Sequence, residues 1–64
     1  MDERIQNTAI TLARFTVKYY QCEKACAAED SPWNRRMARN AYADMMDTQE
    51  YLARLAQSIV NEGI

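Results

Sequence analysis

The residue types that most often carry chemistry are sparse in this chain of 64 residues. There is no histidine, so the side chain most often used as a general base or metal ligand is missing. The chain also lacks a glycine-rich phosphate loop and a serine nucleophile motif. The carboxylates of Asp44, Asp47 and Glu50 recur at helical spacing, which is more typical of a solvated helix face than of an acid/base pair. We therefore expect no enzymatic activity and no cofactor.

Two cysteines, Cys22 and Cys26, are four residues apart and would project from the same side of a helix. Two copies of the chain could bring four such thiolates around a zinc ion. However, both cysteines fall on an apolar seam, and an intracellular protein usually keeps its thiols reduced. We interpret them as core thiols and predict no metal site, with zinc binding and redox bridging as the alternatives.

Cations and aromatic rings gather around the strongest break in the sequence, Glu29-Asp30-Ser31-Pro32-Trp33. Arginine beside an aromatic ring at a helix N-terminus can hold a phosphate or a nucleobase. The candidate anion or nucleotide site consists of Lys24, Trp33, Arg35, Arg36 and Arg39, with Tyr20 as a second ring. The alternative is structural, because nearby carboxylates could neutralise the arginines and Trp33 could plug the end of a helical bundle.

Two helices are expected to position these residues. The chain has one glycine and one proline and is rich in good helix formers. Ser31 suits an N-cap, Pro32 suits the first helical position, and Gly63 suits a C-terminal cap. The pattern predicts one domain, residues 1–64, with a helix over about 3–28, a connection over about 29–31 and a helix over about 32–61. So short a connection makes the helices antiparallel neighbours, which defines an all-α two-helix hairpin.

Each predicted helix carries an apolar seam with alternating steps of three and four residues, the spacing of a bundle helix. The first seam is Ile5, Thr8, Leu12, Phe15, Tyr19, Cys22 and Cys26. The second seam is Ala38, Ala41, Met45, Thr48, Leu52, Leu55 and Ile59.

Each helix also carries a second apolar stripe, which a hairpin alone does not need. A chain this short buries only about 60% of its unfolded surface, and its core rarely supplies more than about 3–5 kcal/mol. We therefore predict homo-oligomerisation, most simply a dimer that forms a four-helix bundle. The expected oligomer or partner interface is Ile10, Val17, Tyr20, Tyr42, Met46, Ala53, Ala56 and Val60. The alternative is that the second stripe is the widened shoulder of an ordinary core.

The charge and the hydropathy pattern bear on location. The formal net charge of −1 provides no overall basic field that would attract nucleic acid or anionic lipid. The N-terminal residues Met1-Asp2-Glu3-Arg4 lack the basic segment and following apolar stretch of a signal peptide. No run approaches the roughly 20 apolar residues that cross a bilayer. We expect a cytoplasmic protein without a membrane partner.

Residues 8–15, Thr-Ala-Ile-Thr-Leu-Ala-Arg-Phe, resemble the opening helix of the Rop family of plasmid-encoded RNA-binding regulators. The chain length, the central loop and the expected four-helix dimer are also similar to that family. The resemblance implies an RNA-binding face on the first helix, where Phe15 matches an important Phe and Arg4 and Arg14 match basic positions. Lys18 would extend this face. Thr11, Tyr19 and Cys26 depart from the family pattern of polar or basic positions, and Val17 replaces a basic residue.

These patterns favour a small, non-enzymatic, oligomeric helical binding or regulatory protein that occupies a surface of a protein target. The alternative hypothesis is a regulator that binds RNA or a nucleotide. It would use either the arginines after the central break or the basic residues of the first helix.

Overall fold

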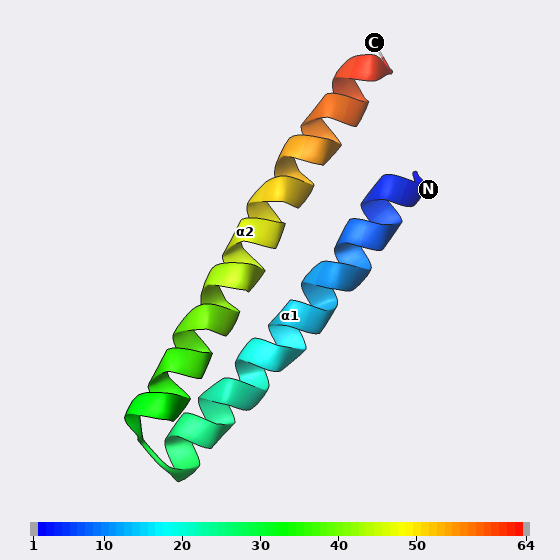
Figure 1. Ribbon diagram of the computed structural model, residues 1–64. Helices are drawn as coiled ribbons and strands as arrows, with labels where there is room; N and C mark the ends of the chain where they lie inside the picture. The colour runs from blue at the N-terminus through cyan, green and yellow to red at the C-terminus, as the bar shows by residue number, and fades with distance from the viewer. Residues whose placement is uncertain (1, 64) are drawn as a thin grey trace.

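The computed structural model describes residues 2–63 and shows two antiparallel helices joined by a short connection (Figure 1). Helix α1 spans Glu3–Ala28 and helix α2 spans Pro32–Glu62. The last turns of α2 extend beyond the start of α1 (Figure 1). The predicted all-α helical hairpin is confirmed.

Both helices begin at a side-chain cap. The Asp2 carboxylate accepts a hydrogen bond from the backbone N–H of Arg4 at 2.8 Å, and the Ser31 hydroxyl accepts one from the backbone N–H of Asn34 at 3.1 Å. Each cap satisfies a backbone donor that the first helical turn leaves free. Pro32 occupies the start of α2, where its missing N–H costs nothing. The start of α2 therefore follows directly from the local sequence.

The connection between the helices is held by Asn34, a residue of the first turn of α2. Its side-chain amide donates to the carbonyl oxygen of Glu29 at 2.7 Å and to that of Ala25 at 3.4 Å. The amide is thus a second donor to these two carbonyl groups, which also accept from the backbone N–H groups of Ser31 and Glu29, and it ties the start of α2 to the end of α1. Gly63 caps α2, as predicted, but its φ of −77° is open to any residue, so this cap does not depend on glycine.

The hairpin core is formed by the two predicted seams. Their residues are all half-buried, except for Ala41, which is 1% exposed and is the only buried residue among residues 2–63. The rings of Tyr19 and Tyr42 lie 5.4 Å apart between centroids, at an interplanar angle of 57°. This tilted geometry is favourable for an aromatic pair. Tyr42, which the sequence places on the second stripe, therefore also contributes to packing between the helices.

The molecule is too thin to enclose a larger core. Its principal dimensions are 50 × 15 × 11 Å, and its accessible surface is 5051 Å². A typical folded monomer of 7.4 kDa exposes about 4,200 Å². The hairpin therefore exposes about 850 Å² more than a typical monomer of its size.

Candidate interaction surfaces

Two shallow hollows between the helices identify the two broad faces of the hairpin. One hollow, of about 300 Å³, is lined by Tyr19, Glu23, Ala38, Arg39 and Tyr42. The other, of about 330 Å³, is lined by Asn7, Thr8, Thr11, Asp47, Thr48 and Tyr51. Since residues three and four apart share one side of a helix, each hollow identifies the rest of its face.

The first hollow belongs to a broad apolar surface. Steps of three and four residues lead from Tyr42 along α2 to Val60, and from Glu23 back along α1 to Ala9. We define the apolar face by the residues Ala9, Ala13, Tyr20, Tyr42, Met46, Ala53, Ala56 and Val60. The exposed fractions are 61% for Tyr20, 57% for Val60, 47% for Tyr42 and 40% for Met46. Thr16 and Gln49 complete this face without adding charge.

Two residues of the predicted interface, Ile10 and Val17, lie elsewhere. They line an open hollow of about 650 Å³ on the outer side of α1, together with Ala13, Arg14, Lys18 and Gln21 and without a residue of α2. We call this surface the outer groove of α1. The angle from the seam explains the difference. Tyr42 follows the seam residue Ala38 by four residues and is rotated about 40° from it, so it stays near the other helix. Ile10 follows the seam residue Ile5 by five residues and is rotated about 140° from it, so it faces outward. The predicted interface therefore divides between two surfaces.

The arginines after the break converge on a further hollow, of about 250 Å³, lined by Pro32, Arg35, Arg36 and Arg39. Arg35 Nε lies 3.3 Å from Asp30 Oδ1. Arg36 and Arg39 form no ion pair within residues 2–63. The structure thus brings together three of the five residues of the candidate anion site.

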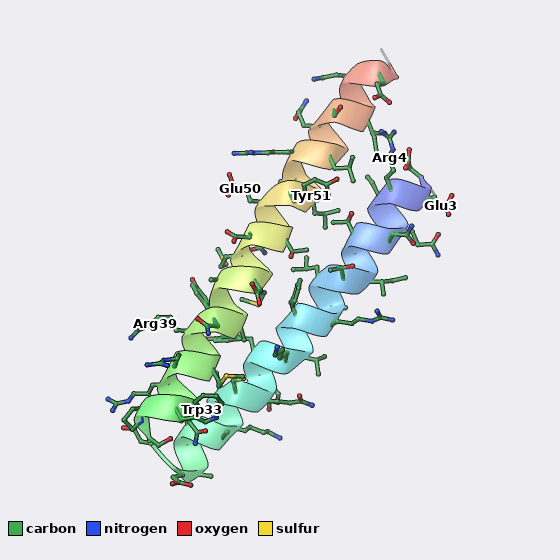
Figure 2. All side chains as sticks on the ribbon, viewed as in Figure 1. Glu3, Arg4, Trp33, Arg39, Glu50 and Tyr51 are labelled. Atoms are coloured by element: carbon green, nitrogen blue, oxygen red, sulfur yellow. The ribbon has the colours of Figure 1, made fainter. Side chains whose placement is uncertain are left out.

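The other two members of that predicted site lie outside the arginine hollow. Lys24 Nζ lies 5.0 Å from the centroid of the Tyr20 ring, in a cation–π contact on α1. Trp33 is 65% exposed at the hairpin tip, so it does not plug the end of the hairpin (Figure 2).

The four predicted RNA-binding residues have different surroundings along α1. Arg14 and Lys18 line the outer groove of α1, but Phe15 is half-buried in the seam. Arg4 lies near the C-terminal end of α2, where its Nη2 atom is 3.1 Å from Asp2 Oδ2 and 3.4 Å from Glu62 Oε2 (Figure 2). Hydrogen bonds from Arg4 lower the pKa of Asp2, and those to Asp2 and Glu62 raise the pKa of Arg4.

The charged groups of the apolar face lie near the hairpin tip. Tyr19 Oη donates a hydrogen bond of 2.6 Å to Glu23 Oε1, which raises the pKa of Tyr19 because the neutral phenol is the donor. Glu23 and Arg39 line the same hollow, yet neither forms an ion pair within residues 2–63. Arg39 points outward from α2, away from α1 (Figure 2).

The cysteines are free thiols in the seam. Cys22 and Cys26 are both half-buried on α1. Within residues 2–63, no three side chains of the metal-binding types come together. This placement supports the interpretation of both cysteines as packing residues.

Comparisons of the chain with protein-family models, curated proteins and solved structures find no match. Over residues 2–63, neither helix is both long and apolar enough to cross a membrane.

Proposed function

We propose that this protein is a small non-enzymatic binding or regulatory protein that assembles with itself and occupies a surface of a protein target in the cytoplasm. The observation that carries the proposal is the apolar face, whose large side chains are about half exposed or more in the single hairpin. Exposed apolar surface of this kind marks interaction sites.

The excess accessible surface of the hairpin suits a second copy of the chain. Each partner in a standard protein interface buries about 800 Å². The hairpin exposes about 850 Å² more than a typical monomer of its mass, which is close to that value. Two hairpins that pack through this face would form a four-helix bundle with a shared core. We therefore propose a homodimer as the working unit.

The outer groove of α1 is the surface that we assign to the protein target. Ile10 and Val17 provide an apolar floor, and Arg14 and Lys18 add positive charge beside it. Between Ile5 and Cys22 the chain contains no carboxylate. A target surface with an apolar patch bordered by carboxylates would complement this groove. The groove shares only Ala13 with the apolar face and otherwise lies on the outer side of α1, so most of it would stay accessible in the dimer.

A double substitution on the apolar face tests the self-association. Tyr42→Glu with Val60→Glu would bury four carboxylates in each dimer, and unpaired buried charge is strongly unfavourable. The expected result is a monomeric mass by light scattering on a sizing column.

The matched control for this test is Tyr51→Glu with Ser58→Glu. It adds the same charge to exposed positions outside the apolar face and should leave the dimer mass unchanged. A dimer that survives the first substitution, or that is lost equally in the control, would contradict the assignment of this face.

A second candidate function is binding of RNA or a nucleotide through phosphate. Three arginines line one hollow, and the only carboxylate paired with them within residues 2–63 is that of Asp30. Titration with RNA and with nucleotides at low salt should show binding that weakens steeply as salt is added. Arg36→Ala with Arg39→Ala should weaken it, whereas Arg54→Ala is the control at a distant exposed site. No binding at low salt would rule out this function.

A further inference from the structure

We infer that the second copy on the apolar face lies with its hairpin tip at the same end, so that α1 of each chain packs on α2 of the other. This inference rests on the self-association proposed above and adds its orientation. It commits to one of the two ways in which two-fold symmetry can pair these faces.

The hairpin itself shows which residues share a level along its length. Tyr19 lies beside Tyr42, and Asn34 reaches back to Ala25. A two-fold axis parallel to the helices keeps each residue at its level and exchanges α1 for α2. Each level of α1 then faces the same level of the partner's α2. An axis perpendicular to the helices instead places α1 on α1 and α2 on α2, with the tips at opposite ends.

The charges on the apolar face favour the parallel axis. They include Glu23 and Lys24 on α1 and Arg35 and Arg39 on α2, all near the tip. With the tips at the same end, Glu23 of each chain faces the partner's Arg39, and symmetry repeats the pair. Glu23 Oε2 accepts no hydrogen bond within residues 2–63, so it is open to such a contact.

The opposite orientation leaves the same charges without partners. Arg39 would then lie over the partner's α2 near Ala53 and Ala56, and Glu23 would lie near the acidic start of the partner's α1. A charge that loses water at an interface without gaining a partner is costly. Electrostatic complementarity thus selects the orientation, whereas apolar area alone does not.

The shapes of the side chains agree with this choice. Tyr20 lies one residue from Tyr19, so its exposed ring would reach the level of the partner's hollow between Tyr19 and Tyr42. The smaller residues Ala13 and Thr16 would lie near the level of the partner's Met46. Large side chains would therefore face small ones or an open hollow, as close packing requires.

Mixing two charge variants tests the orientation. Both variants keep Cys22 and Cys26 unchanged. Glu23→Arg alone places like charges opposite each other in its homodimer, and so does Arg39→Glu alone. When the two variants are mixed, the heterodimer pairs opposite charges at both sites. The expected result in native mass spectrometry is a heterodimer fraction well above the half that random exchange produces. Charge repulsion within each chain is the same in both kinds of dimer, so it cannot cause this preference.

Three outcomes separate the inference from the proposal on which it rests. A heterodimer preference supports the tips at the same end. Random exchange between stable dimers overturns the orientation but leaves self-association intact. Monomers of the unaltered chain overturn both, and they would leave a protein target as the occupant of the apolar face.

A spin label at the tip provides an independent distance. Glu29→Cys in a Cys22→Ala, Cys26→Ala background should give a label separation within about 25 Å, roughly two helix diameters. Tips at opposite ends would be separated by most of the 50 Å length of the hairpin and would refute the inference.

Discussion

Ala41 is the most buried residue among residues 2–63 and provides a sharp test of the packing between the helices. It is 1% exposed and lies on the seam, next to Tyr42 and its ring contact with Tyr19. Ala41→Leu adds three carbon atoms where no space remains. Overpacking of this kind typically costs about 1–3 kcal/mol. A core of this size rarely supplies more than about 3–5 kcal/mol, so the substitution should remove a large share of the stability.

Ala43→Leu is the matched control, because Ala43 is exposed on the same helix only two residues away. In thermal unfolding followed by circular dichroism, Ala41→Leu should lower Tm by about 4–24 °C, taking about 4–8 °C per kcal/mol for a domain of this size. Ala43→Leu should leave Tm nearly unchanged, because both residues are good helix formers. Equal Tm values for the two variants would refute the view that helix–helix packing at Ala41 limits stability.

Three further predictions follow from the caps, the titrating groups and the assembly. Ser31→Ala should cost about 1 kcal/mol by removing the cap of α2, whereas Ser58→Ala, at an exposed position within α2, should change little in the same unfolding assay. In an ultraviolet absorbance titration, Tyr19 should ionise at a higher pH than in the Glu23→Gln variant. The pKa of Tyr19 is raised in the folded protein, so its hydrogen bond contributes fully to stability below pH 10.0, the ordinary tyrosine pKa. This contribution is lost as the pH rises through the raised pKa of the folded protein. Tm should rise with protein concentration if the dimer forms, and a constant Tm would contradict assembly.

The local sequence was enough to predict the helices and much of the candidate sites. Ser31 and Pro32 mark the start of α2 through cap chemistry that involves only neighbouring residues. The seam spacing also placed Phe15 between the helices, and the structure shows it half-buried there. Arg35, Arg36 and Arg39 fall within five consecutive residues of α2, and they line one hollow.

Other features could not be read from spacing within one helix. The Asn34 side chain reaches across the connection to Ala25, a contact that exists only once the chain has turned back. The ring contact of Tyr19 with Tyr42 likewise joins residues of the two helices. These contacts depend on how side chains from separate segments meet.

The second apolar stripes show most clearly where sequence reasoning ends. The helical period alone establishes that Ile10 and Val17 share one side of α1, and that Tyr42 and Met46 share one side of α2. Only the packing of the two helices decides that Tyr42 lines a hollow shared with α1, whereas Ile10 and Val17 line a groove to which α2 contributes no residue. The physical reason is that the helical period fixes only the order of residues around one helix. Which residues of two helices form a shared surface depends on how each helix is rotated about its own axis.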